Sequence, residues 1–146
     1  MKLFIDGDGS PVVKESVDIA KKYNLNVIIV KNFAHHIEDS YAEVVTVDIS
    51  NDSADYYIVN RAKKGDIVVT QDYGLAALAL AKGVLVINQD GMIFNEYNIN
   101  SLLDQRYVHA KMRSQGLRHS NPKKRKLEAD HKFTAALEEL IKNNLD

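Results

Sequence analysis

Five short, almost uniformly apolar runs alternate along the chain with segments in which apolar residues recur every three or four positions. The runs cover residues 2–5, 27–30, 44–49, 67–70 and 84–87. Runs of this length without polar alternation are typical of strands buried on both faces of a sheet. The other segments predict helices from Pro11, over about 54–63, over 75–82, around 100–113 and over 127–146. This alternation predicts an α/β fold, namely a single domain with a mainly parallel sheet of about five strands, flanking helices and C-terminal helices.

Local signals refine these boundaries. Ser10 suits the N-cap of the first helix and Pro11 its first helical position. Asp90 and Gly91 predict a hairpin turn into residues 92–94. Because ligands of parallel α/β sheets bind outside the carboxyl ends of the strands, residues that directly follow a strand are the first candidates for a functional site.

Length and composition place the chain among ordinary globular domains. It has 146 residues, of which 45% are hydrophobic and 27% charged. The absence of cysteine excludes a disulfide framework, a thiolate metal site and a cysteine nucleophile. No apolar run approaches the roughly 18 residues of a membrane-spanning helix, and acid at Asp6 comes too early for a signal peptide. We therefore expect a cytoplasmic protein that does not enter a membrane.

The net charge of −1 conceals a strong asymmetry. Residues 106–126, here called the basic strip, carry eight lysines and arginines and no carboxylate, whereas the rest of the chain is acidic on balance. Such a strip is typical of a surface that binds phosphates. A solvated connection that only keeps the protein soluble is the alternative.

Acidic residues follow two of the predicted strands. Asp6 and Asp8 come directly after the first strand, and Asp72 follows the fourth. Carboxylates held together repel one another, and a hard divalent ion such as Mg²⁺ or Mn²⁺ relieves the repulsion. Asp55, in the first turn of its helix, is a weaker candidate ligand because a carboxylate there also interacts favourably with the helix dipole. The competing interpretation for the other three is that they form turns and cap helices.

A second polar cluster contains His35, His36, Glu38 and Asp39. These residue types bind metals, but the two histidines lack the spacing that places ligands on one helix face. A solvated loop is the favoured interpretation.

Several motifs together resemble the YaiI/YqxD family of small bacterial proteins. They are residues 6–15 (DGDGSPVVKE), 54–55 (AD), 65–72 (GDIVVTQD), 75–76 (LA) and the later Arg106, Arg113 and Gly116. The resemblance covers almost the whole chain. It implies a fold similar to PIN-like nuclease domains, with acidic residues at the carboxyl edge of the sheet holding Mg²⁺ or Mn²⁺. By position, Asp6, Asp8 and Asp72 match the acidic motifs, and Asp55 matches the helix acid.

The first motif departs from the family pattern. The family usually has Asp-Ala-Asp-Ala-Cys-Pro, whereas Gly7, Gly9 and Ser10 replace the alanines and the cysteine here. A role for that thiol therefore does not apply to this chain.

The favoured functional hypothesis is a metal-dependent nuclease that cleaves RNA, with DNA as the alternative substrate. Asp6, Asp8 and Asp72 would hold the ions, while Arg106 and Arg113 would neutralise phosphate charge. Weaker candidates for contacts with water or phosphate are Ser10, Thr70 and the run Lys123, Lys124, Arg125 and Lys126.

Two other hypotheses stay open. The basic strip is equally typical of a nucleic-acid-binding or regulatory module without turnover. Residues 4–10 also resemble the nucleophile loop of haloacid-dehalogenase-like phosphatases, with Asp6 as nucleophile and Asp8 as acid/base. That second resemblance ends after the loop, because no matching acidic pair follows a late strand.

Overall fold

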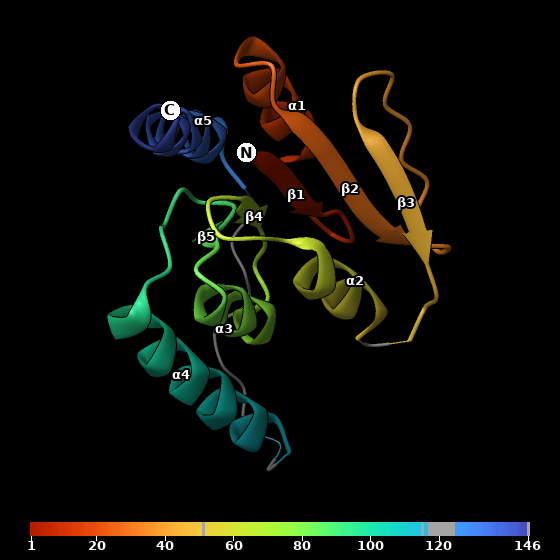
Figure 1. Ribbon diagram of the computed structural model, residues 1–146. Helices are drawn as coiled ribbons and strands as arrows, with labels where there is room; N and C mark the ends of the chain where they lie inside the picture. The colour runs from red at the N-terminus through yellow and green to blue at the C-terminus, as the bar shows by residue number, and fades with distance from the viewer. Residues whose placement is uncertain (51, 115, 117–124, 146) are drawn as a thin grey trace.

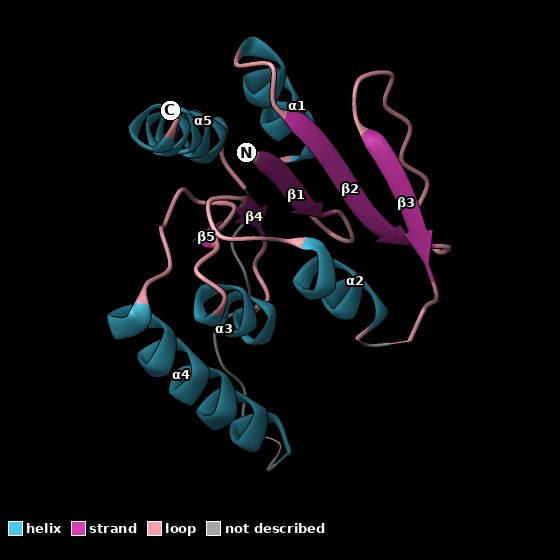
Figure 2. Cartoon of the chain, viewed as in Figure 1, coloured by secondary structure: helices cyan, strands magenta, loops and turns pink. Residues whose placement is uncertain are grey.

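The computed structural model describes residues 1–50, 52–114, 116 and 125–145. Within these ranges the chain forms one five-stranded sheet and five helices (Figures 1 and 2). The elements are β1 (Lys2–Asp6), α1 (Val13–Lys22), β2 (Asn26–Asn32), β3 (Glu43–Val47), α2 (Ser53–Arg61), β4 (Ile67–Val69), α3 (Tyr73–Ala81), β5 (Leu85–Ile87), α4 (Glu96–Ser114) and α5 (Leu127–Asn144). All neighbouring strands pair in parallel. The predicted α/β fold with a parallel sheet of five strands is confirmed.

Helices cover both faces of the sheet, which explains why the strands are apolar throughout. Alternate residues of β1 point to opposite faces: Leu3 and Ile5 pack in the cluster under α1 and α5, and Phe4 packs in the cluster under α2 and α3. Figure 1 shows α1 and α5 on one side of the sheet and α2, α3 and α4 on the other. No surface of the central strands is left for a polar face.

The strand order β3-β2-β1-β4-β5 creates a natural place for a site. The chain builds outward from β1 to β2 and β3, and then returns to add β4 and β5 on the other side of β1. The carboxyl ends of β1 and β4 are neighbours, with Ile5 paired to Val69. Such a reversal of strand order leaves a crevice at the carboxyl edge, where ligands of this class of sheet bind.

The first helix begins later than the sequence predicts. The prediction that Ser10 caps α1 and Pro11 opens it is wrong, because α1 begins at Val13. Two consecutive turns carry the chain from the sheet edge to the helix, and Gly9 adopts a left-handed conformation with φ of 73° in the first of them. The Ser10 hydroxyl accepts a 3.4 Å bond from the Val12 amide within the second turn.

The predicted hairpin after the fifth strand is reduced to one antiparallel bridge between Ile87 and Ile93. The Asn88 amide donates to the Met92 carbonyl and closes the turn, but no sixth strand follows among the described residues. In the described ranges, no helix combines the length and the apolar character needed to cross a bilayer.

Candidate active site

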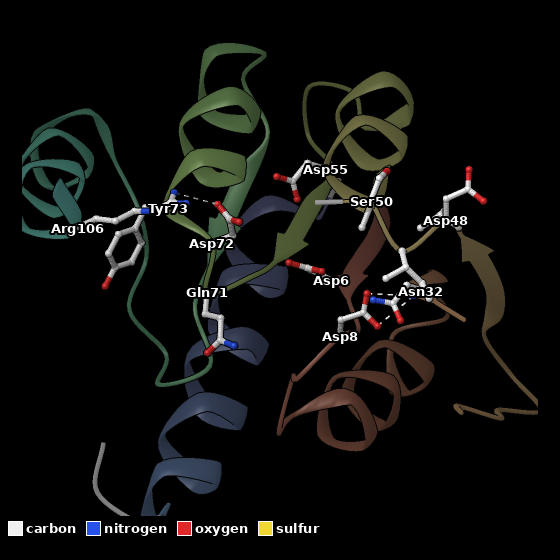
Figure 3. A pocket seen from close by; sticks show the side chains of 13 residues that line it. Asp6, Asp8, Asn32, Asp48, Ser50, Asp55, Gln71, Asp72, Tyr73 and Arg106 are labelled. Atoms are coloured by element: carbon white, nitrogen blue, oxygen red, sulfur yellow. Dashed lines mark hydrogen bonds and ion pairs between the residues drawn. The ribbon is translucent and has the colours of Figure 1, made fainter. Parts of the chain in front are cut away.

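A cavity of about 600 Å³ opens at the carboxyl edge of the sheet, where the strand order reverses. Its wall includes five aspartates and one arginine: Asp6, Asp8, Asp48, Asp55, Asp72 and Arg106. In Figure 3, Asp6, Asp55 and Asp72 face the same space, although they come from β1, the first turn of α2 and the start of α3. We call this the acidic cavity. It brings together Asp6, Asp8, Asp55 and Asp72, the four carboxylates that the sequence predicts as candidate metal ligands.

Asp6 and Asp72 are linked through Thr70. The Thr70 hydroxyl donates to Asp6 Oδ2 at 2.9 Å and accepts from the Asp72 amide at 3.0 Å. Thr70 follows β4 directly, and β4 pairs with β1, so the sheet register itself sets this contact. Thr70 is buried and does not line the acidic cavity. Its hydroxyl therefore fixes the positions of Asp6 and Asp72 from within the fold and is not exposed to a ligand in the cavity.

Asp72 is both a helix cap and a wall of the cavity. Its Oδ1 accepts from the Leu75 amide at 3.1 Å, which satisfies a free N–H in the first turn of α3. The same oxygen lies 3.6 Å from Nη1 of Arg106 on α4. A Cβ at Gly74 would lie 3.2 Å from that oxygen and 3.3 Å from the Arg106 nitrogen, so glycine leaves room for the pair. Asp72 can therefore cap α3 and still present a carboxylate to the cavity, so its interpretation as a helix cap does not exclude its interpretation as a candidate metal ligand.

Asp8 is braced against the end of β2. Its two carboxylate oxygens accept from the Asn32 amide at 3.1 and 3.0 Å. His35 Nδ1 lies 2.7 Å from Asp8 Oδ1. A carboxylate has about four lone-pair positions, so these contacts orient Asp8 and leave sites free for another ligand.

Two carboxyl groups of the acidic cavity bind protons unusually tightly. Burial raises the pKa of Asp6 to about 6; the Thr70 hydrogen bond opposes that rise, and the charges of Asp72 and Asp8 add to it. Burial also raises the pKa of Asp55 to about 7, helped by the charges of Asp72, Asp6 and Asp52 and opposed by Arg106. The cavity thus holds more negative charge than its surroundings can stabilise.

The carboxylates suit a hard divalent ion bound mostly through water. Oxygen ligands of this kind are those that Mg²⁺ and Mn²⁺ prefer. Within the described ranges, however, no group of three or more aspartate, glutamate or histidine side chains forms a ready metal cage. Mg²⁺ usually keeps several waters and takes one or two carboxylates from the protein, so the residues present fit that mode and not a closed protein cage.

The other predicted contact residues lie elsewhere. Ser10 lines a separate hollow with His35 and His36. Arg113 is exposed near the end of α4 and does not line the acidic cavity. Lys126 is exposed at the N-cap of α5, whereas Lys123 and Lys124 lie outside the described residues. Among the predicted cations that the structure describes, Arg106 alone lines the acidic cavity.

Arg125 has an internal role that the sequence did not reveal. Its guanidinium donates to Asp130 Oδ1 at 2.7 Å, to Asp90 Oδ1 at 3.1 Å and to the Gln89 carbonyl at 2.7 Å. These contacts fasten the start of α5 to the turn after β5. These three bonds leave further N–H groups of the guanidinium unused, so the phosphate contact of Arg125 stays a prediction.

The sequence did not predict the place of Asp48 and His35 in this region. Asp48 lines the acidic cavity because β3 ends at Val47, whereas the predicted strand ran on to residue 49 and hid Asp48 inside it. His35 was assigned to a solvated loop but contacts Asp8. The rule that selected Asp6 and Asp72 selects Asp48 as well once the strand boundary is placed correctly.

Fold and site together define a parallel α/β protein with an acidic cavity at its topological switch point. Residues 4–143 match the family described as "Uncharacterized BCR, YaiI/YqxD family", and the chain belongs to that family. A UPF0178 protein of Enterococcus faecalis is 44% identical over 99% of this chain and 100% of its own length. One from Natranaerobius thermophilus is 43% identical over 97% and 96% of the two chains. A crystal structure of a Rae1 (YacP) mutant from Bacillus subtilis is similar with a TM-score of 0.47 and 15% identity, covering 80% of this chain and 84% of that one.

Proposed function

We propose that the protein is a Mg²⁺- or Mn²⁺-dependent phosphodiester hydrolase, a nuclease that acts on RNA in preference to DNA. The observation that carries the proposal is the convergence of Asp6, Asp55 and Asp72 on one cavity at the carboxyl edge. Burial and mutual repulsion raise the pKa of two of these groups, and a divalent cation would relieve that strain. A nucleic acid brings its phosphates to such an ion.

Residues of the acidic cavity and Thr70 have different roles in the proposed phosphodiester cleavage. A bound divalent ion would polarise a phosphoryl oxygen and supply hydroxide at neutral pH. Asp6 and Asp72 would hold the ion, with Thr70 fixing their relative positions, and Asp8 and Asp55 would add negative charge in the same cavity. Arg106 is 56% exposed and only loosely paired with Asp72, which leaves its guanidinium available to neutralise phosphate charge.

Removing single carboxylates tests the proposal. Asp6→Asn and Asp72→Asn should each abolish Mn²⁺-dependent cleavage of single-stranded RNA, because each removes a charged ligand. The thermal transition of the Asp6 variant should stay nearly unchanged or rise, since neutralising one of several crowded carboxylates relieves repulsion in the metal-free protein. Asp18→Asn, an exposed aspartate on α1 that does not line the cavity, is the matched control. Cleavage at the parent rate in both test variants would remove these residues from the mechanism.

A binding module without turnover is the second candidate, and the basic strip favours it. Eight cations without a carboxylate between residues 106 and 126 support contact with a phosphate backbone whether or not the protein cuts. Binding that persists unchanged in chelator, together with no cleavage in Mn²⁺, would favour this candidate. A different measurement distinguishes a phosphatase of the haloacid-dehalogenase type from both candidates: a phosphoryl group trapped on Asp6 would favour the phosphatase.

A further inference from the structure

The acidic cavity continues into two neighbouring hollows along α2. A hollow of about 510 Å³ shares Val47 and Asp48 with it. The next hollow, of about 630 Å³, shares Tyr57, Asn60 and Arg61 with the second. Consecutive hollows share wall residues, so they lie next to one another in a row beside α2, from Asp6 and Asp72 at the carboxyl edge of the sheet to Lys2 and Asn26 at its amino edge. We call this row the α2–β3 furrow; its middle part is bounded by Phe33, Thr46, Tyr56, Tyr57, Asn60 and Arg61.

Two large aromatic rings stand exposed on the wall of the furrow. Phe33, just after β2, is 68% exposed, and Tyr56 on α2 is 63% exposed. Neither ring contributes to a core cluster of the fold. Exposed rings beside a groove are the surfaces on which unpaired bases stack, whatever their sequence. The adjacent Tyr57 ring already carries the Arg61 guanidinium, whose central carbon lies 3.6 Å from the ring centroid.

Charge along the furrow changes sign. Its first end is the acidic cavity, whereas the far hollow is lined by Lys2, Arg61 and Lys63 against a single carboxylate, Glu43. A chain of phosphates fits this arrangement, because cations outnumber carboxylates in the far hollow and a metal ion would neutralise the acidic end. An apolar peptide would bury these cations without a partner and is disfavoured.

We propose that the α2–β3 furrow binds single-stranded nucleic acid, with bases stacked on Phe33 and Tyr56 and the backbone leading past Arg61 away from the acidic cavity. The proposal deepens the proposed function and rests on it, since the acidic cavity at one end of the furrow is where cleavage would occur. A duplex is excluded from this mode because its bases are already stacked and paired. The binding surface is thereby assigned to α2 and the residues around β3, in addition to the basic strip.

The test is fluorescence anisotropy with a short labelled oligouridylate in EDTA, where no cleavage occurs. Phe33→Ala and Tyr56→Ala should each weaken binding about five-fold or more, the lower limit of base–aromatic stacking. Tyr56→Phe keeps the ring and should bind like the parent. Tyr97→Ala removes an equally large, 91% exposed ring on α4, outside the furrow, and should also bind like the parent. All three side chains are exposed in the folded chain, so the thermal transitions of the four variants should agree with that of the parent.

Each outcome decides between the two proposals. Equal binding by Phe33→Ala, Tyr56→Ala and Tyr97→Ala, an unlabelled duplex that competes as well as a single strand, or no binding by the parent overturns the furrow. Loss of binding in the two furrow variants, with no cleavage by the parent in Mn²⁺, leaves the furrow standing and refutes the nuclease. If cleavage depends on Asp6 while both furrow variants bind and cut like the parent, the nuclease stands and the furrow is refuted.

Discussion

At the scale of single residues, the acidic cavity concentrates charge that the folded chain only partly stabilises. Thr70 and Arg106 compensate some of it, the first through a hydrogen bond to Asp6 and the second through its charge beside Asp72. Burial outweighs both, and the pKa values of Asp6 and Asp55 stay well above 3.8, the ordinary value for aspartate. This crowding of carboxylates lowers the stability of the folded chain, and the proposed divalent cation would offset that loss.

The raised pKa values predict how stability depends on pH. The folded chain binds protons at Asp6 and Asp55 with pKa values of about 6 and 7, whereas in the unfolded chain both titrate near 3.8. Their contribution to stability is therefore fully present below about pH 4 and is lost as the pH rises through 6 and 7. Asp55→Asn is neutral throughout, so its free energy of unfolding relative to the parent should increase between about pH 4 and pH 7.

The measurement is urea unfolding in EDTA at several pH values. Asp18→Asn, on the surface of α1, corrects for the loss of one charge from the whole molecule. Mn²⁺ should stabilise the parent more at pH 8 than at pH 5, because protons compete with the ion for the same oxygens. A difference between Asp55→Asn and the parent that stays constant with pH would show that the Asp55 carboxyl titrates normally.

The sequence could identify Asp6, Asp8 and Asp72 because each follows an apolar strand and the carboxyl-edge rule needs no coordinates. It could also name Asp55, but only the packing of α2 beside the sheet decides that this carboxyl faces the others. His35 was beyond prediction for a related reason. Its contact with Asp8 joins residues 27 positions apart through an irregular loop, and no periodic pattern encodes such a contact.

At the scale of elements, prediction succeeded where both faces of a strand are buried and failed at boundaries. The third strand was extended to residue 49 because Val47 and Ile49 look alike in the sequence. Ile49 is in fact 62% exposed and belongs to the loop before α2. An apolar side chain on the surface is common, so hydrophobicity alone does not place the end of a strand.

Arg125 makes the attachment of α5 testable. Its three hydrogen-bonded partners hold the start of α5 against the turn that contains Gln89 and Asp90. Arg125→Gln should lower the free energy of unfolding by about 1–3 kcal/mol, because bonds to charged partners are lost and two carboxylates lose their counter-charge. Lys126→Gln, the exposed neighbour, should change it by less than about 0.5 kcal/mol. Equal stability of the two variants in urea titrations would mean that Arg125 does not fasten α5.

At the scale of the whole molecule, the alternation of strands and helices predicts a parallel sheet, but it does not say which strands are neighbours. The order β3-β2-β1-β4-β5 is settled by packing: α1 and α5 share one face, and the chain must reverse direction across β1 to cover the other. That reversal places the crevice between β1 and β4. The site is therefore a property of the complete fold, although its residues are visible in the sequence.

The distribution of charge over the molecule gives the last prediction, which concerns how many phosphates each basic surface contacts. Two groups of basic residues compete for a phosphate backbone: the lysines of the basic strip, and Arg61 with Lys63 in the furrow. Each phosphate neutralised on a single strand contributes about −0.7 to the slope of log K against log salt. Replacing Arg61 and Lys63 by glutamine should therefore flatten the slope by about 1.4 if both contact phosphate.

The strip is tested in the same titration. Replacing Lys123, Lys124 and Lys126 by glutamine, with Arg125 kept because it holds α5, should flatten the slope by about 2 if all three contact phosphate. The double variant Lys14→Gln/Lys132→Gln removes two exposed lysines from α1 and α5, outside the furrow and the strip, and should leave the slope unchanged. An unchanged slope in the strip variant would show that these lysines are only a solvated surface, and an unchanged slope in the Arg61/Lys63 variant would remove the furrow cations from the path of the backbone.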